Sequence, residues 1–132
     1  MWPRVGGLRS LELGTPGEMR ANIVERVLSG EKTATTGLLA TGYHDESEEL
    51  EHPGERLALV GNDGTPVATL EIIDAVVMRF DEVGLEHAVA EGEGWSTLED
   101  WRQDHVSYWN RNGTEVGDDT EVVCISFRLA DS

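Results

Sequence analysis

The feature that most constrains the fold is a series of short segments in which apolar and polar residues alternate with a period of two. Residues 57–60 and 67–73 predict two strands, and the Asn-Asp-Gly sequence at 62–64 has the chemistry of a hairpin turn. A further strand is predicted over 75–80, and the alternation over 123–129 predicts a half-buried closing strand. Because the strands follow one another with few helices between them, a parallel sheet of βαβ units is disfavoured. The pattern favours an α+β fold, in the form of a small mixed β-barrel with helices packed on it.

Three helices and one further short strand are predicted around these segments. The first helix covers 17–29, where a Thr-Pro-Gly-Glu sequence has the form of a capping box and apolar residues recur at a spacing of four. The small, polar residues 31–37 then predict a loop that runs into a short strand. Asp81 can cap a short second helix, and a second capping-box sequence at 96–99 opens a third helix that ends at Asn112-Gly113.

Length and composition indicate a single domain. The chain has 132 residues, of which 39% are hydrophobic, enough for one modest core. The polar, Gly-rich start predicts a loosely ordered N-terminus over residues 1–10, which leaves 11–132 as one domain. Residues 43–56 contain six acids and predict a solvated loop. The single cysteine, Cys124, excludes an internal disulfide, and its apolar neighbours predict a buried, inert thiol.

The charge balance narrows the possible functions. The chain has 26 Asp and Glu residues against 10 Lys and Arg residues, a formal net charge of −16. Proteins that neutralise many phosphates carry a basic surface, as do polybasic membrane anchors, so both classes are disfavoured. The sequence contains no apolar run long enough to span a bilayer and no signal peptide. Together with the lone cysteine, these features predict a cytoplasmic protein with no membrane partner.

Lys32 is the first candidate for chemistry. It is the only lysine, since the other nine basic residues are arginines, and it lies in a short polar segment with Thr33 and Thr35. A neutral lysine amine can take a proton from a threonine hydroxyl and make it a nucleophile. Side chains alternate in an extended segment, so Lys32 and Thr35 are expected on opposite faces unless the chain bends. The alternative interpretation is a solvated surface lysine.

The loop Glu91-Gly92-Glu93-Gly94 is the second candidate. Glycines on both sides of Glu93 allow the backbone to come close to a ligand. Two neighbouring carboxylates, or one in an apolar pocket beside Trp95, can provide a general acid. The alternative is an acidic linker between two helices.

The aromatic face of the helix that starts near residue 98 is the third candidate. Trp101, His105, Tyr108 and Trp109 recur along one side, and flat rings can stack on a nucleobase. Aromatic residues at helical spacing also serve as core residues, which is the alternative. His105 can act as a base or a ligand, but the four histidines lack metal-ligand spacing, so no metal is expected. Because phosphate-binding glycine motifs and serine-hydrolase motifs are absent from the sequence, no cofactor is expected.

The segment Gly30-Glu31-Lys32-Thr33-Ala34-Thr35 resembles the GxKxxT motif of the ASCH domain family, whose fold is of the PUA-like type. Further blocks resemble, in the same order, those of one bacterial ASCH subgroup formerly described as a domain of unknown function. The resemblance covers about residues 11–130, so it identifies 11–132 as a single ASCH domain. The blocks are residues 53–57, 80–83, 91–94, 98–105 and 122–124.

The resemblance implies three kinds of activity. ASCH domains were proposed as RNA-binding modules, some small members are amidohydrolases that remove the acetyl group of N4-acetylcytidine, and a further member is described as a ribonuclease. The amidohydrolases use a Lys–Thr–Glu set, which corresponds here to Lys32, Thr35 and a glutamate of the 91–93 loop. Spacing does not decide between the two glutamates; the flanking glycines favour Glu93 as catalytic, with Glu91 in substrate binding.

These considerations favour a hydrolase that acts on a modified nucleoside through Lys32, Thr35 and Glu93. Arg56, Trp101 and His105 are expected to contact the substrate together with the second glutamate. The alternatives are a noncatalytic RNA- or nucleotide-binding module, a ribonuclease, or a ligand-sensing domain in which Lys32 only holds an anion. The expected partner is therefore a small nucleoside-like ligand or RNA, and the oligomeric state is not predicted.

Overall fold

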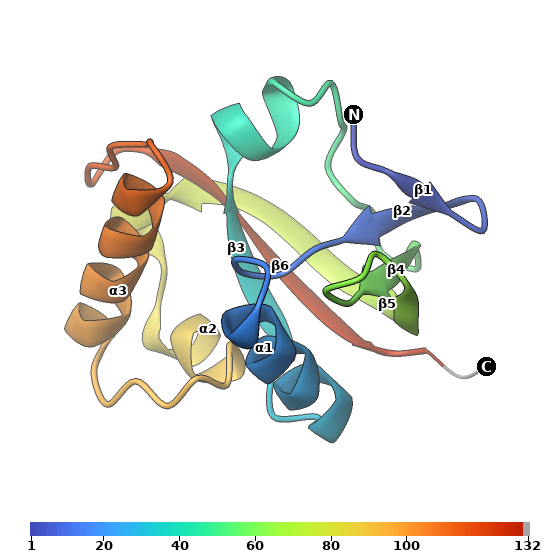
Figure 1. The fold of residues 1–132 in the computed structure, drawn as a ribbon. Helices are drawn as coiled ribbons and strands as arrows, with labels where there is room; N and C mark the ends of the chain where they lie inside the picture. Colours follow the sequence, from blue (N-terminus) through green and yellow to red (C-terminus); the bar gives the residue numbers. More distant parts are fainter. Residues whose placement is uncertain (131–132) are drawn as a thin grey trace.

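The computed structural model describes residues 1–130 and shows one mixed sheet of six strands with helices around it (Figure 1). The strand order is β1-β2-β4-β5-β6-β3, and only the β2–β4 pair is parallel. The strands are β1 (Arg4–Val5), β2 (Leu8–Leu11), β3 (Ala34–Leu38), β4 (Arg56–Val60), β5 (Pro66–Arg79) and β6 (Glu121–Leu129).

The α+β class is confirmed, but the sheet is not closed into the expected barrel. In the described part of the chain, β1 and β3 form the two edges of the sheet and do not pair with each other. A cavity lined by Ser10 of β2, Thr35 of β3 and side chains including Trp2 and Tyr43 occupies the space where closure would occur. Side chains thus separate these edges.

The helices are α1 (Glu18–Ser29), α2 (Leu85–Ala90) and α3 (Leu98–Arg111), with shorter turns at Leu39–His44 and Phe80–Glu82. The structure therefore contains the helix predicted over 17–29, although Gly17 is its N-cap and Thr15 makes no side-chain cap. At α3, Thr97 is the N-cap and its hydroxyl accepts a hydrogen bond from the Asp100 backbone N–H. Within residues 1–130, none of the helices has the length and apolar character needed to cross a membrane.

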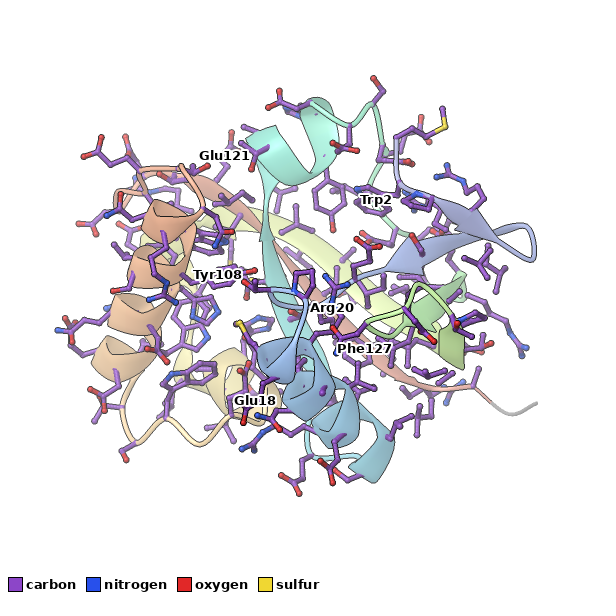
Figure 2. All side chains as sticks on the ribbon, viewed as in Figure 1. Trp2, Glu18, Arg20, Tyr108, Glu121 and Phe127 are labelled. Atoms are coloured by element: carbon purple, nitrogen blue, oxygen red, sulfur yellow. The ribbon has the colours of Figure 1, made fainter. Side chains whose placement is uncertain are left out.

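The sheet separates two apolar cores. Successive residues of a strand point to opposite faces, and β6 accordingly sends Val123 and Ile125 into one core and Val122 and Cys124 into the other. Helix α1 covers the first core, and α2 and α3 cover the second; side chains fill the space between α3 and the sheet (Figure 2). Burial raises the pKa of the Cys124 thiol to about 11, in agreement with a buried, inert thiol.

Two strands expected over 67–73 and 75–80 are one long strand, β5. Its pairing with β6 shifts register between Ile72 and Asp74, as in a β-bulge. The bulge interrupts the period of two at this point, which explains why the sequence pattern divides into two segments.

The expectation of a loosely ordered N-terminus is wrong for the residues that form β1 and β2. Arg4 and Arg9 of these strands donate hydrogen bonds to Glu48 and Glu55, at 2.8 and 2.7 Å. These arginines bind the N-terminus to the acidic 43–56 segment, which is therefore not a fully solvated loop. The hydrogen bond from Arg4 lowers the pKa of the Glu48 carboxyl to about 2.

Candidate functional site

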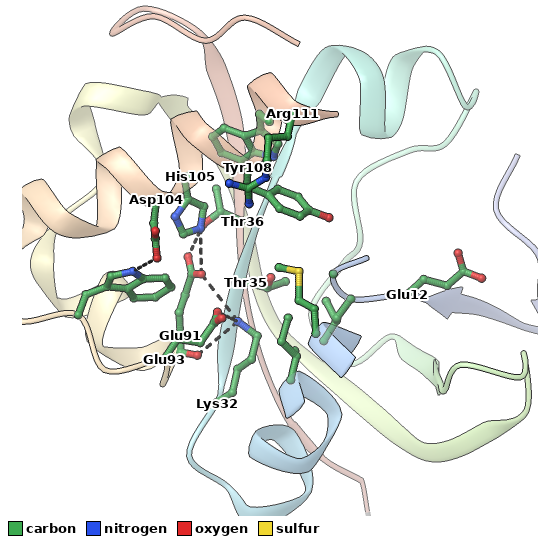
Figure 3. Close-up of a pocket in the computed structure, with 16 residues that line it drawn as sticks. Glu12, Lys32, Thr35, Thr36, Glu91, Glu93, Asp104, His105, Tyr108 and Arg111 are labelled. Carbon is green, nitrogen blue, oxygen red and sulfur yellow. Dashed lines mark hydrogen bonds and ion pairs between the residues drawn. The ribbon is translucent and has the colours of Figure 1, made fainter. Parts of the chain in front are cut away.

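A cavity of about 250 Å³ lies between α1, β3, the loop after α2, and α3 (Figure 3). Its lining combines apolar and aromatic side chains with a small set of ionisable and hydroxyl groups. The polar residues central to its chemistry are Lys32, Thr35, Thr36, Glu91, Glu93 and His105.

Lys32 is buried, with only 3% of its surface exposed, so the alternative of a solvated surface lysine is wrong. Its Nζ atom donates hydrogen bonds of 3.3 Å to the Glu91 backbone carbonyl and to the Glu93 carboxylate. The chain reaches this position because α1 ends at Ser29 and the Lys32 backbone N–H then turns back to the Arg26 carbonyl, at 3.0 Å. Two acidic neighbours thus stabilise the charge of a buried amine.

Gly92 allows the glutamate loop to approach this turn closely. Its φ is +71°, a left-handed conformation that favours glycine, and a Cβ atom there would lie 2.9 Å from the Lys32 Cα atom and against the Glu31 carbonyl. Gly92 thus allows a close approach to the Glu31–Lys32 backbone, while the expected approach of this loop to a ligand stays a prediction.

Glu91 is the buried centre of the site, with 1% of its side chain exposed. Its carboxylate accepts hydrogen bonds from the Thr36 hydroxyl at 2.6 Å and from the Trp101 indole at 3.0 Å. His105 Nε2 lies 3.2 Å from Oε1, and Lys32 Nζ lies 3.7 Å from the same atom. Burial alone would raise the pKa of Glu91, but hydrogen bonds from His105 and from His87, whose Nε2 lies 3.2 Å from Oε2, and the charge of Lys32 lower it well below its ordinary value.

Glu93 is more accessible than Glu91, with 25% of its side chain exposed, and its carboxylate reaches the Lys32 amine from the cavity. The two glutamates therefore differ in environment. Glu91 is enclosed by protein donors, whereas Glu93 lies where a ligand can reach it. The burial of Glu91 argues against the substrate contact predicted for it, and its carboxylate instead holds Thr36 and Trp101 in place.

Thr35 and Thr36 both line the cavity, because β3 is an edge strand and the cavity extends around that edge. Lys32 precedes the strand, which begins at Ala34, so the alternation expected between Lys32 and Thr35 does not apply. The Thr36 hydroxyl is engaged by Glu91 and lies 2.8 Å from His87 Nε2. The sequence analysis missed Thr36; its only signal is its place beside Thr35.

The aromatic face of α3 divides between core and cavity. His105, Tyr108 and Trp109 line the cavity, but Trp101 is fully buried beneath it. Trp101 stacks on the His105 ring with centroids 4.3 Å apart, so it supports the site without being open to a substrate. The expectation of a substrate contact is therefore wrong for Trp101, while His105 does face the cavity.

The structure does not bring Arg56 to this site. Arg56 is exposed on β4 and does not line the cavity. In the sheet, β5 and β6 lie between β4 and β3, the strand that borders the cavity. Glu12 and Arg111 line it instead, and no local motif in the sequence marks either residue. No group of three or more His, Cys, Asp and Glu side chains within residues 1–130 is arranged to hold a metal ion.

Comparisons with known proteins agree with this architecture. The protein EF3133 from Enterococcus faecalis V583 is 28% identical, with a TM-score of 0.75 over 86% of this chain and 70% of its own. The ASCH domain from Lactobacillus crispatus JV V101 is 23% identical, with a TM-score of 0.77 over 91% of this chain and 77% of its own. No curated protein matches the sequence. Residues 10–131 match the ASCH domain family, and the chain therefore belongs to that family.

Proposed function

We propose that this protein hydrolyses the amide of a modified, uncharged nucleoside of the N4-acetylcytidine type. The observation that carries the proposal is that Lys32, Thr35 and Glu93 line one cavity, with Lys32 and Glu93 in hydrogen-bond contact at 3.3 Å. This set contains a potential base, a potential nucleophile and a potential acid, as amide hydrolysis requires.

The size and lining of the cavity support a small aromatic ligand. Its volume of about 250 Å³ is near the lower end of the range for small-molecule sites, ~300–1,000 Å³. Trp95 and Tyr108 provide flat rings at its wall, on which a pyrimidine can stack. A single modified nucleoside fits this description better than a folded polymer.

The first chemical step starts from the Lys32–Glu93 ion pair. With a substrate in the cavity, a proton passes from Lys32 to Glu93 along their 3.3 Å hydrogen bond. The Lys32 amine then takes the proton of the Thr35 hydroxyl while Oγ1 forms a bond to the acyl carbon. The carbon–nitrogen bond breaks, and the leaving amine takes the proton from Glu93. An acyl ester on Thr35 and a free amine result, and Lys32 and Glu93 are again charged.

Water completes the reaction. A water molecule attacks the ester carbon and gives a proton to the Glu93 carboxylate, while the Thr35 oxygen leaves and takes a proton from Lys32. Transfer of the proton from Glu93 back to Lys32 restores the starting ion pair. The carboxylic acid product is released, so no other reactant is needed.

The test is release of acetate from N4-acetylcytidine. Lys32→Ala and Thr35→Val should each lower turnover by at least ~100-fold, the usual contribution of a base or nucleophile, whereas Thr35→Ser should retain part of it. Thr33→Val is the matched control, because Thr33 is an exposed neighbour that does not line the cavity. A wild-type protein that hydrolyses no member of a panel of N4-acylated cytidines overturns the proposal. Salt-dependent RNA binding without hydrolysis would then favour the binding-module alternative.

A further inference from the structure

A second cavity, of about 240 Å³, adjoins the first cavity along β3. The two cavities share Glu12, Leu13, Thr35 and Thr36 in their linings. In Figure 3, Thr35 lies between Glu93, which lines the first cavity, and Glu12, which lines both. A group that is bound at Thr35 therefore has a cavity on either side.

The geometry of an amide determines which part of a substrate faces the second cavity. The carbonyl carbon of an amide carries the nitrogen on one side and the acyl chain on the other, in one plane. In the proposed reaction this carbon lies at the Thr35 hydroxyl, and the nitrogen and its base lie in the first cavity. The acyl chain then points away from the base, towards the second cavity. The single methyl group of an acetyl is much smaller than a space of about 240 Å³.

The lining of the second cavity is mainly apolar and is held in place without a ligand. The Trp2 and Tyr43 rings meet edge to face with centroids 5.1 Å apart. The Trp2 indole donates a 3.0 Å hydrogen bond to the Gly42 carbonyl, and the Tyr43 hydroxyl donates one of 2.9 Å to Glu51. The aliphatic side chains of the lining include those of Leu11, Leu13 and Ile125. Such a preformed apolar wall suits a hydrocarbon group.

The charges of the second cavity are negative. Among the residues that the structure describes, no lysine or arginine lines it, whereas Glu12 and Glu51 do. Glu51 is buried, with 4% of its surface exposed. A carboxylate at the end of an acyl chain would therefore lose its hydration beside like charges, which is costly. The cavity thus favours an uncharged chain.

We propose that the second cavity holds the acyl group of the substrate, and that this group is an uncharged, apolar chain larger than acetyl. This inference rests on the proposed function and adds to it the part of the substrate that is removed. Trp2 and Leu11 line the second cavity but not the first, so they determine the preference among acyl groups.

The experiment compares cytidines that carry an acetyl, butyryl or succinyl group on N4. Butyryl has two more CH₂ groups than acetyl, and succinyl has the length of butyryl but ends in a carboxylate. After division by the rate of alkaline hydrolysis, kcat/KM for butyryl should exceed that for acetyl by at least ~10-fold. Succinyl should fall at least ~10-fold below butyryl, because its carboxylate would be buried beside Glu12 and Glu51.

Two variants test the lining of the second cavity. Trp2→Ala removes part of its wall and should bring the butyryl and acetyl values to within ~3-fold of each other. Trp95→Ala is the matched control, because Trp95 lines only the first of these two cavities, and it should lower both values while their ratio is kept. Leu11→Ala should also lower the ratio, and it provides the test if the Trp2 variant fails to fold. A ratio that both Trp2→Ala and Leu11→Ala leave unchanged overturns the acyl pocket.

The same ligands separate this inference from the proposed function. Hydrolysis of the acetyl and butyryl compounds with equal corrected kcat/KM overturns the acyl pocket and leaves the proposed activity intact. If the wild type hydrolyses neither compound, calorimetric titration gives the second reading. Tighter binding of N4-butyrylcytidine than of N4-acetylcytidine, lost in Trp2→Ala, then supports the pocket and overturns the proposed activity, whereas equal binding overturns both.

Discussion

Replacement of Glu91 by glutamine should destabilise the fold strongly. The carboxylate is 1% exposed and accepts hydrogen bonds from Thr36 and Trp101, while His105 and Lys32 lie within 3.2 and 3.7 Å of it. Removal of one partner from a buried ion pair costs about 3–5 kcal/mol, because the remaining charge has lost its compensation. That is a large part of the ~5–15 kcal/mol that stabilises a typical domain.

Urea unfolding followed by tryptophan fluorescence measures this effect. With an m value of about 2 kcal/mol/M, the midpoint of Glu91→Gln should fall by about 1.5–2.5 M. Glu93→Gln is the matched control, because Glu93 pairs with the same Lys32 amine but its side chain is 25% exposed. A partly exposed ion pair contributes only ~0–1 kcal/mol, so this variant should unfold near the wild-type midpoint while losing activity.

The pH dependence provides a second readout of the same variant. Because the pKa of Glu91 is lowered in the folded protein, its stabilising effect is complete above the ordinary value of 4.5 and declines as the pH falls below it. Glu91→Gln should therefore show less loss of stability on acidification than the wild type does. A glutamine variant within ~1 kcal/mol of the wild type, or an equal loss in Glu93→Gln, would refute the assignment of Glu91 as the buried centre.

Two further predictions concern the backbone of the site and the N-terminal strands. Gly92→Ala should lower the free energy of unfolding in urea by ~3 kcal/mol or more. A left-handed alanine costs ~1–2 kcal/mol, and its Cβ atom would also clash with the Lys32 Cα atom at 2.9 Å. Gly94→Ala, whose Cβ atom would meet nothing within 4 Å, should show only the cost of the left-handed conformation. The hydrogen bond from Arg4 lowers the Glu48 pKa to about 2. The stability that this ion pair contributes is therefore complete above pH 4.5 and is lost as the pH falls towards about 2. Melting temperatures of Glu48→Gln should thus depend less on pH over this interval, and an unchanged dependence would contradict the role of this ion pair.

The elements that local periodicity encodes were predictable from the sequence. Alternation of apolar residues identified β4, β5 and β6, and a spacing of four identified α1, because each pattern reflects one buried face of a single element. Lys32 and Thr35 differ, because alternation along an extended segment predicts opposite faces and only the resemblance to the family motif brings them together. Barrel closure was not predictable, since it depends on whether two edge strands meet, and here side chains and a cavity lie between them.

The unpredicted features all depend on contacts between distant residues. Glu48 is buried because Arg4 and Arg9, 44 and 39 residues away in the chain, reach its carboxylate. The six acids of residues 43–56 predict a solvated loop only if no arginine from elsewhere in the chain pairs with them, and the sequence does not show that Arg4 and Arg9 do. The difference between Glu91 and Glu93 likewise follows from the close approach of the loop to the turn before β3, which spacing alone does not reveal.

The charges within the site reconcile an acidic chain with an uncharged ligand. His105 Nδ1 lies 2.8 Å from the Trp101 carbonyl oxygen and Nε2 lies 3.2 Å from the Glu91 carboxylate. The His105 ring is thus held between the Trp101 backbone and the Glu91 carboxylate. Lys32, His87 and His105 surround the Glu91 carboxylate, although the chain as a whole carries −16. An anionic ligand would lie beside the carboxylates of Glu91 and Glu93 in this cavity, whereas a neutral amide adds no charge there. The net charge of −16 repels a polyanion, so the charge of the chain and that of the cavity are both consistent with the neutral nucleoside that we propose.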